Sequence, residues 1–347
     1  MSELIGNKTW AGYWRSMRDE AWLSFHDWLG TPARLTAWTE HFPADDVPAI
    51  SVASSGIDET LVAPWHRFGQ WPVFMFPRRE DGLLTGWARD SFGDYRGHRR
   101  TCQPLLDFAS TTKRQVAIDI RDIDGLSCSK GPLEKYDCLT DFVRHECKKE
   151  LGEADETAFY RALAHDEIRI IHCENPADHL SSYAWDGRVF LSNVGGSHHF
   201  AVAQYLSRSF DLPVIIEAEI HQTSLNSFAI EALSDEFDIF AAHAEANSEC
   251  VFIDAMRPFG AAFYWIPLPD RFGPASAIFL PRSDQRARRA ADVLRDAGFT
   301  DLCALLLDIA KKQQTVGDRV IELGADAVPG RINEALRNRI SEQLAHL

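Results

Sequence analysis

Hydrophobic residues recur at helical and strand spacings along most of the chain. Near the N-terminus the apolar aromatic positions fall in groups spaced three or four residues apart, which predicts an amphipathic helix over residues 9–29. These positions are Trp10, Trp14, Trp22, Phe25 and Trp28. An aromatic face of this kind is typical of a helix that packs on a core. Residues 42–101 contain only short apolar runs, so an irregular, loop-rich region is expected there.

Strand patterns become frequent from about residue 114. The expected strands cover residues 115–120, 168–172, 182–185, 188–192 and 214–218. Asp186-Gly187 separates two of them and predicts a hairpin turn. One helical pattern follows Gly131-Pro132, and a second, over residues 198–208, follows Gly195-Gly196.

The pattern is mainly helical beyond residue 225. Helices are expected over residues 228–246, 284–297, 301–313 and 331–346, and strands over 250–254, 261–266 and 277–280. The last helix carries one apolar stripe, formed by Ile332, Leu336, Ile340 and Leu344. The chain is therefore expected to be an α+β protein in three regions: an aromatic-rich N-terminal region (1–113) with a helical extension, a central mixed-sheet domain (114–224) and a C-terminal region (225–347) that ends in helices.

Composition and charge narrow the class of protein. The 347 residues are 45% hydrophobic and 25% charged, as in ordinary globular proteins, and the net charge of -15 disfavours binding to nucleic acid or to an anionic membrane. No apolar run is long enough to span a membrane, and Met1–Thr9 lacks the apolar segment of a secretory signal. The seven cysteines are scattered without a CxxC pair, which favours reduced thiols. A cytoplasmic protein is expected.

The most informative segment is a strand, a Gly-Gly turn and a helix between Arg188 and Leu206. Glycine lets the backbone approach a ligand closely, and the first N–H groups of a helix have no partner within the helix. Together with the helix dipole, these groups make a binding site for an anion such as phosphate. The segment therefore predicts a phosphate site at Gly195 and Gly196.

This segment resembles the signature of the ParB/sulfiredoxin superfamily, in which two glycines, Cys-His-Arg, an aromatic residue and Ala open a helix, and an Ile-Pro strand follows. The matching residues are Gly195, Gly196, Ser197, His198, His199, Phe200 and Ala201, followed by residues 212–215. Sulfiredoxins also carry a Lys, a Ser and a Thr on a helix that faces the nucleotide, and Lys135, Cys138 and Phe142 hold those places. The resemblance covers about residues 114–221 and implies a ParB/sulfiredoxin-like domain.

The chain departs from both branches of this superfamily. Ser197 replaces the catalytic cysteine of sulfiredoxins, and a serine hydroxyl is a much poorer nucleophile than a thiolate, so sulfinate repair is not expected. His199 replaces the arginine that steadies the phosphates. The Arg-rich box and helix-turn-helix module of the DNA-partition proteins are not seen in the sequence, in agreement with its acidic charge.

The chemistry that the resemblance implies is binding of a nucleoside triphosphate, such as ATP or CTP, with Mg²⁺. The protein would then be a phosphotransferase or an NTPase. Gly195 and Gly196 would hold the phosphates, with Lys135 and Cys138 as further cofactor-binding residues. Ser197, His198 and His199 would be catalytic, with a histidine as proton donor or base. Replacing Gly196 by a bulky residue should then abolish nucleotide binding in a protein that stays folded.

Three alternatives remain open. A metal-dependent hydrolase could use His172, His179, His198 and His199, although their spacing matches no standard zinc site. A Cys–His hydrolase would need folding to bring Cys173 or Cys250 to a distant histidine. A catalytically inactive module of the same fold could instead bind a protein partner, because loss of the cysteine and the arginine is what decay of the site would produce.

Overall fold

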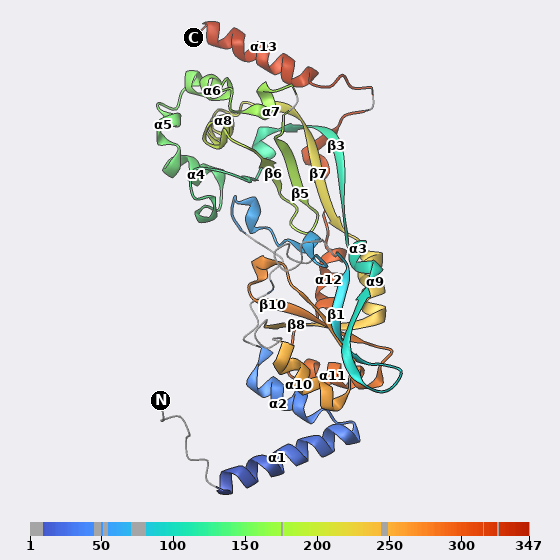
Figure 1. Cartoon of the computed structure of the whole chain (residues 1–347). Coiled ribbons are helices and arrows are strands. Elements are labelled where there is room, and N and C mark those ends of the chain that lie inside the picture. The colour runs from blue at the N-terminus through green and yellow to red at the C-terminus, as the bar shows by residue number, and fades with distance from the viewer. Residues whose placement is uncertain are drawn as a thin grey trace. The chain divides into compact units, whose positions relative to one another are not determined.

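Two compact units make up the chain, and each is built from segments that are separated in sequence. The structure is a computed structural model that describes residues 10–44, 50, 55–70, 81–174, 176–243, 249–314, 316–324 and 326–346. Unit 1 comprises residues 1–50, 67–108 and 226–308, and unit 2 comprises residues 51–66, 109–225 and 309–347. Each unit combines helices with a β-sheet, so the expected α+β class is confirmed (Figure 1).

Unit 1 contains a five-stranded antiparallel sheet in the order β2-β1-β9-β10-β8. Its strands are β1 (Leu83–Arg89), β2 (Tyr95–Thr101), β8 (Phe237–His243), β9 (Phe263–Pro267) and β10 (Ala275–Pro281). Its helices are α1 (Trp10–Leu29), α2 (Ala33–His41), α3 (Gln103–Leu106), α9 (Ser227–Glu236), α10 (Glu249–Phe259), α11 (Gln285–Asp296) and most of α12 (Leu302–Lys311).

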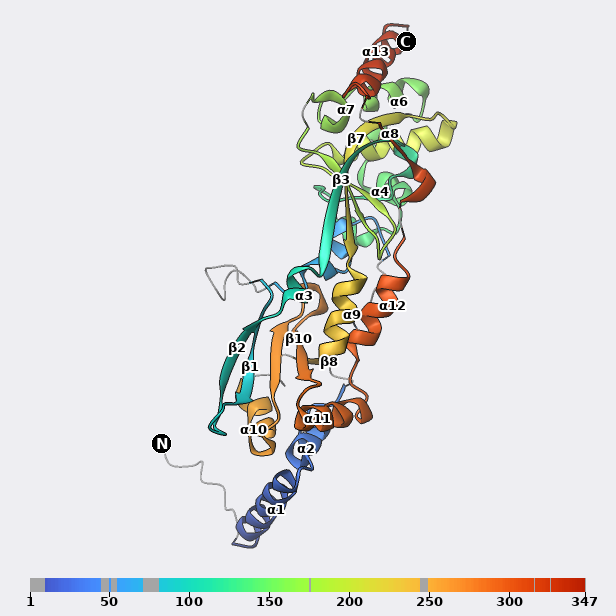
Figure 2. The same cartoon turned by 90° about the vertical axis from the view of Figure 1, so that its right-hand side faces the viewer.

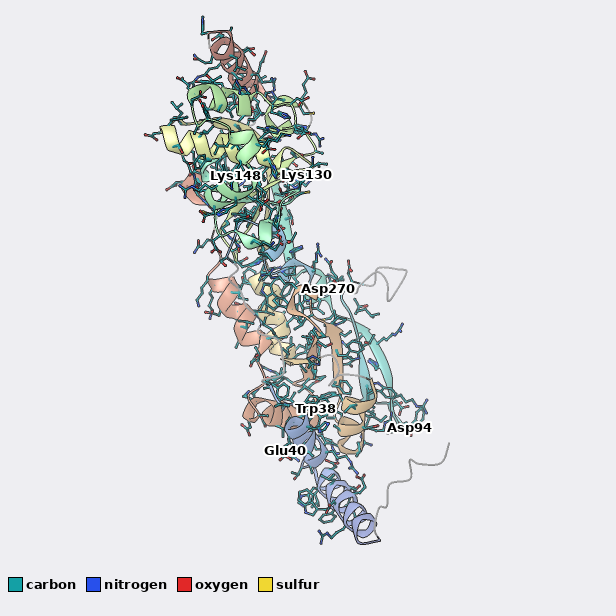
Figure 3. The ribbon with its side chains drawn as sticks, turned by 90° about the vertical axis from the view of Figure 1, so that its left-hand side faces the viewer. Trp38, Glu40, Asp94, Lys130, Lys148 and Asp270 are labelled. Carbon is teal, nitrogen blue, oxygen red and sulfur yellow. The ribbon has the colours of Figure 1, made fainter. Side chains whose placement is uncertain are left out.

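The core of unit 1 is aromatic. Trp38 of α2 meets the Phe252 ring of α10 edge-on at 5.0 Å, and Phe252 in turn meets Phe263 of β9 at 4.8 Å. Helix α11 adds a face of small residues, with Ala287, Ala290 and Ala291 buried against the same core. Trp38, labelled in Figure 3, is thus buried. The aromatic face expected to pack on a core was that of α1, and this expectation is wrong for Trp22, Phe25 and Trp28, which are 56%, 56% and 73% exposed.

Unit 2 contains a six-stranded mixed sheet in the order β11-β3-β7-β5-β6-β4. Its strands are β3 (Ala109–Asp119), β4 (Gly125–Leu126), β5 (His179–Tyr183), β6 (Val189–Ser192), β7 (Ile215–Leu225) and β11 (Val320–Glu322). Its helices are α4 (Leu139–Glu146), α5 (Lys148–Leu151), α6 (Glu156–Leu163), α7 (Arg169–His172), α8 (Ser197–Phe210) and α13 (Arg331–His346). The pairs β5–β7 and β4–β6 are parallel, and the others are antiparallel.

Helix α8 is the central helix of unit 2, and α4 and α6 pack against it (Figure 2). Small residues such as Ala201 and Ala203 are fully buried and let it approach its neighbours closely. Gln204, 1% exposed, donates hydrogen bonds to the carbonyl oxygens of Ile120 and Ile123. Asp211 ends the helix in the left-handed conformation, with φ +53°. The start of α8 is therefore held by a well-packed element.

Several elements predicted from periodicity are confirmed. The N-terminal helix, the strand at 115–120, the helix at 198–208, and the helices at 284–297, 301–313 and 331–346 correspond to α1, β3, α8, α11, α12 and α13. The strands expected near 214–218, 261–266 and 277–280 correspond to β7, β9 and β10. The predicted hairpin is β5–β6, and Gly187 has the positive φ, +80°, that such a turn requires.

The single helix expected over residues 228–246 is wrong. Helix α9 ends at Glu236 and strand β8 follows at once, with six of its seven residues buried. A strand that is buried on both faces has no polar–apolar alternation, so its apolar run could not be distinguished from a helix by periodicity.

The strands expected at 168–172 and 250–254 are also wrong, since these residues lie in α7 and α10. In α7 the carbonyl oxygens of Ile170 and Ile171 accept hydrogen bonds from Asn333 and Arg337 of α13, which satisfies the end of a one-turn helix. Asn333 lies more than 160 residues from Ile170 in the chain. The local sequence pattern around α7 therefore could not indicate this contact.

The loop-rich region expected over residues 42–101 contains the β1–β2 hairpin, which is a further correction. The two units also divide the chain differently from the three consecutive regions expected, because segments on either side of the central region return to complete each sheet and core. Among the described residues, no helix is both long and apolar enough to cross a membrane.

Asn333 joins α13 to the sheet of unit 2. Its Oδ1 accepts from the Glu217 amide at 2.8 Å, and its Nδ2 donates to the Glu217 and Ile170 carbonyl oxygens, both at 2.9 Å. Strand β5 pairs with β7 only from Ile220 onward, so Asn333 satisfies β7 backbone groups that no strand among the described residues covers on that side. These contacts are buried, with Asn333 7% exposed.

We expect Asn333→Ala to lower the free energy of unfolding by about 2–3 kcal/mol, because it leaves buried backbone groups without partners. Urea denaturation followed by circular dichroism measures the change. Asn338→Ala, on the exposed side of the same helix, is the matched control and should change stability by no more than about 0.5 kcal/mol. Equal effects of the two substitutions would contradict this role of Asn333.

Candidate functional site

The turn that precedes α8 is held by two buried polar side chains. Asn193, 5% exposed, donates from Nδ2 to the carbonyl oxygens of Cys128 and Gly195, both at 3.0 Å. Asp178, 4% exposed, accepts from the Val194 amide at 2.9 Å. The loops before β5 and after β4 thus fix the Gly-Gly turn in place.

Gly196 is the residue directly before α8 and has the left-handed conformation, with φ +69° and no side-chain cap. A Cβ atom at this position would lie 2.3 Å from the Glu167 carbonyl oxygen, well inside van der Waals contact. Glycine is thus required by the packing of the turn against the backbone of Glu167 and Ile168, whether or not a ligand binds. This geometry therefore contradicts the expectation that a bulky residue at Gly196 would leave the fold intact.

Three backbone amides at the start of α8 are without partners in the described part of the chain. The first hydrogen bond of the helix runs from the Phe200 amide to the Gly196 carbonyl oxygen at 2.9 Å, so the N–H groups of Ser197, His198 and His199 precede it. Unpaired amides at the positive end of a 14-residue helix favour an anion.

Arg169, in the first turn of α7, adds a cation to this turn. Its guanidinium nitrogens lie 3.8 and 3.9 Å from the point where a Cβ on Gly195 would be. The guanidinium makes no hydrogen bond or ion pair with the described residues, although the Asp178 carboxylate is near enough to interact with it electrostatically. An Arg with unused donors beside uncapped amides suits a phosphate or carboxylate ligand.

The three residues expected to be catalytic occupy different environments. Ser197, 7% exposed, donates its hydroxyl to Ser129 Oγ at 3.1 Å. The His198 ring meets Phe142 edge-on at 5.5 Å, and its Nδ1 lies 3.4 Å from Glu150 Oε1, while its Nε2 is buried without a partner. The contacts described for Ser197 include no histidine ring, so the geometry gives this serine no activating base.

His199 stacks on His165, with ring centroids 3.4 Å apart and planes 10° from parallel. Burial lowers the pKa of His199, and the neighbouring His165 ring lowers it further. The neutral form of the His199 ring is therefore favoured near pH 7.

The expected cofactor-binding residues do not gather at one place. Lys135 is exposed at the end of a 3₁₀ turn (Leu133–Lys135), and Cys138 precedes α4. Cys138 lines a cavity of about 300 Å³ together with Gln204 and Arg208 from the middle and end of α8. The described lining of that cavity includes none of residues 195–199.

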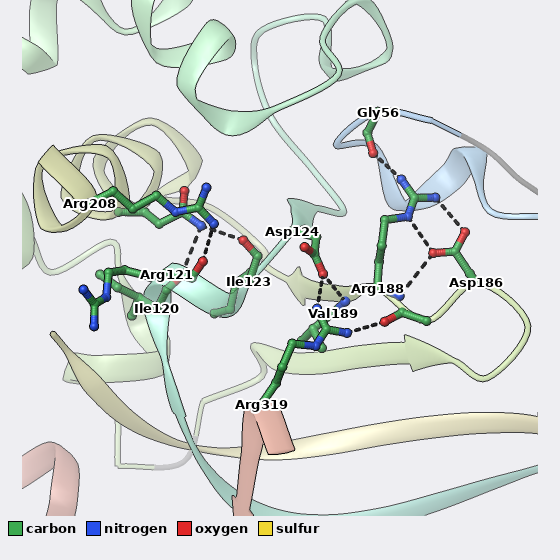
Figure 4. Close-up of polar contacts among 12 residues, drawn as sticks. Gly56, Ile120, Arg121, Ile123, Asp124, Asp186, Arg188, Val189, Arg208 and Arg319 are labelled. Atoms are coloured by element: carbon green, nitrogen blue, oxygen red, sulfur yellow. Dashed lines mark hydrogen bonds and ion pairs between the residues drawn. The ribbon is translucent and has the colours of Figure 1, made fainter. Parts of the chain in front are cut away.

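The polar groups around this cavity bond mainly to one another (Figure 4). Arg188 pairs with Asp186 at 2.6 Å and also donates to the Gly56 carbonyl oxygen. Asp124 accepts from the Val189 amide at 2.8 Å and pairs with Arg319 at 2.7 Å. These contacts tie the β5–β6 hairpin to neighbouring segments of unit 2 and give Asp124 and Arg188 partners without a ligand.

The four histidines of the metal alternative do not converge. The Nε2 of His172 lies 2.7 Å from the Leu163 carbonyl oxygen, and His179 stacks on His221 with centroids 4.0 Å apart. Only His199 belongs to a group with metal-ligand geometry, and its companions are His165 and Glu167, which sequence reasoning missed. In the sequence, only the closeness of His165 and Glu167 could have indicated this group. The residues around them do not show that His199 lies beside them in the fold.

A groove of about 960 Å³ in unit 2 bears on the Cys–His alternative. Cys173, His179 and His221 all line it. The Nε2 of His221, however, contacts Glu219 Oε1 at 2.5 Å, and no described contact joins the Cys173 thiol to either ring. The side chain of Cys250 lies outside the described residues.

The fold and turn define an α+β protein with a mixed-sheet unit and an uncapped helix at its Gly-Gly turn. The chain belongs to a family described as a family of unknown function, DUF6685, whose model matches residues 113–317. No curated protein and no solved structure matches the chain. The matched segment includes the turn, Arg169, and the His165, Glu167 and His199 group.

Gly196→Ala is expected to lower the free energy of unfolding by about 1–3 kcal/mol, because it combines a positive φ with a clash against backbone. Gly195→Ala is the matched control, since its Cβ would meet only the Arg169 guanidinium at 3.8 Å or more. It should cost no more than about 1 kcal/mol. Chemical denaturation of both variants measures the difference, and a Gly196→Ala protein as stable as the Gly195→Ala protein would refute the packing argument.

Proposed function

We propose that the protein binds a nucleotide, such as ATP or CTP, with the phosphates at the start of α8. The observation that carries the proposal is the set of three unpartnered amides at residues 197–199 beside the unpaired guanidinium of Arg169. Helix amides and a bidentate Arg are both common ligands of phosphate. The resemblance of the turn to the ParB/sulfiredoxin signature supports the same ligand class.

Local charge around the turn supports an anion despite the acidic net charge of -15. Lys130 follows Ser129, which accepts from Ser197, and Lys149 precedes Glu150, which contacts His198. Both lysines are exposed, as is Lys148, and Figure 3 labels Lys130 and Lys148 in unit 2. These cations, with Arg169, can offset the nearby carboxylates over short distances because salt screens distant charges.

The chain's own groups would bind and orient the phosphates rather than supply a nucleophile. The amides of Ser197, His198 and His199 would donate to phosphate oxygens, and Arg169 would neutralise part of their charge. Mg²⁺ on the nucleotide would supply the remaining charge neutralisation that phosphoryl transfer or hydrolysis requires. A phosphotransferase or NTPase activity would thus rest on positioning, with the acceptor or a water molecule as the attacking group.

Arg169→Ala is expected to weaken nucleotide binding at least about tenfold, because charged hydrogen bonds contribute roughly 1.5–3 kcal/mol each. The measurement is isothermal titration with ATP, CTP, GTP and UTP, each with and without Mg²⁺, and with tripolyphosphate as a base-free probe. Arg161→Ala, which removes an exposed arginine on α6, is the matched control and should leave the affinity unchanged.

Two results would overturn the proposal. One is a wild-type protein that binds none of these compounds, and the other is equal weakening by Arg169→Ala and Arg161→Ala. If tripolyphosphate binds as tightly as the nucleotides, the site recognises the phosphates and the base does not contribute to binding.

A second candidate, a module that binds a protein partner, is favoured by one observation in unit 1. Helix α1 exposes four large apolar side chains: Trp22 (56% exposed), Phe25 (56%), Trp28 (73%) and Leu29 (53%). Such a concentration on one helix is more than the scattered apolar residues of an ordinary surface. A protein that ignores all nucleotides would favour this candidate.

A further inference from the structure

His165, Glu167 and His199 bring three metal-ligating groups to one place in unit 2. One ligand atom from each lies within 4.8 Å of the other two. His165 and Glu167 come from the connection between α6 and α7, and His199 comes from the first turn of α8. The set is thus assembled from two segments that are 32 residues apart or more in the chain.

The ligand atoms of these residues have few competing partners. The Glu167 carboxylate and both ring nitrogens of His199 make no hydrogen bond with the described residues. His165 Nδ1 receives only a long contact from the Glu167 amide, at 3.3 Å, and lies 3.5 Å from the Asp166 carboxylate. Breaking this long hydrogen bond would cost less free energy than a metal–nitrogen bond would supply.

The backbone beneath the three side chains is fixed independently of any ion. The Ile168 amide donates to the His165 carbonyl oxygen at 3.0 Å, and Gly196 packs against the Glu167 carbonyl group. Donor atoms around one zinc ion lie about 3.4 Å apart, given bonds of about 2.1 Å in a tetrahedral site. Closing the 4.8 Å group around an ion therefore needs its ligand atoms to move by about an ångström or two. The stacked His165 and His199 rings, 10° from parallel, would also have to tilt apart so that their in-plane lone pairs converge on the ion.

Two carboxylates act on the His199 ring, and the group is accessible to solvent. Glu150 and Glu167 both place negative charge near the His199 ring. The His165 side chain is 36% exposed and Glu167 is exposed, so water or a substrate oxygen could occupy the remaining coordination positions. Three protein ligands with open positions are characteristic of catalytic rather than structural metal sites.

We propose that His165, Glu167 and His199 bind a divalent transition-metal ion such as Zn²⁺. Two imidazoles and one carboxylate suit Zn²⁺, Fe²⁺, Co²⁺ or Mn²⁺. Mg²⁺ and Ca²⁺ prefer oxygen ligands and are not expected here. The site is separate from the Mg²⁺ that a nucleotide would carry, and it does not depend on nucleotide binding.

The test is metal titration of the full chain after chelator treatment, with no nucleotide present. We expect one equivalent of Zn²⁺ to bind by isothermal titration, and Co²⁺ to give the visible absorption bands of a nitrogen- and oxygen-ligated ion. Mg²⁺ should give no heat at the same concentrations. His165→Ala and Glu167→Gln should each weaken Zn²⁺ binding at least tenfold, because each removes one of three ligands.

His346→Ala is the matched control, since it removes an exposed histidine near the end of α13 and should not change Zn²⁺ affinity. Circular dichroism checks that the variants are folded, and both test residues lie in a partly exposed connection where truncation leaves no buried cavity. The inference is overturned if the wild-type protein binds no Zn²⁺ or Co²⁺. It is also overturned if binding survives both test substitutions unchanged, or if Mg²⁺ binds as tightly as Zn²⁺.

Discussion

The contact between Gly196 and the Glu167 carbonyl group is the constraint on which both candidate sites depend. It requires a residue without a side chain and a positive φ at the same position. By holding the α6–α7 connection against the start of α8, it places Arg169 beside the free amides and His165 beside His199. The glycine thus serves first to pack two segments closely, and the ligand-binding groups are positioned as a consequence.

The elements that sequence patterns predicted well are those with one clear face. Helices α11 and α13 show helical periodicity because each presents one apolar side to a core. The start of α8 is marked instead by Gly195-Gly196, and the β5–β6 turn by Asp186-Gly187. Strand β8 and helix α7 were assigned wrongly for physical reasons. β8 is apolar on both faces, and α7 is a single turn whose carbonyl oxygens bond to Asn333 and Arg337 of α13.

The candidate site could be predicted only in part. The Gly-Gly turn and its helix are contiguous in sequence, so their strand–turn–helix order and the free amides follow from local pattern. Arg169, His165 and Glu167 reach the same place through tertiary packing, which one sequence does not show. The histidines chosen by their closeness in sequence, His172 and His179, have their ring nitrogens or faces engaged elsewhere.

His199 belongs to both proposed sites, the phosphate site and the metal site. Its backbone amide is one of the three that would hold phosphate, while its ring belongs to the group that would hold the metal ion. With no ion bound, the Glu167 carboxylate acts on His199 and opposes an anion at the adjacent amides. A divalent ion would reverse the sign of that local charge and strengthen phosphate binding at the helix terminus. Although the net charge of the protein is -15, an anion site needs only a local excess of positive charge. Arg169, the dipole of α8 and the bound metal ion would together supply that excess.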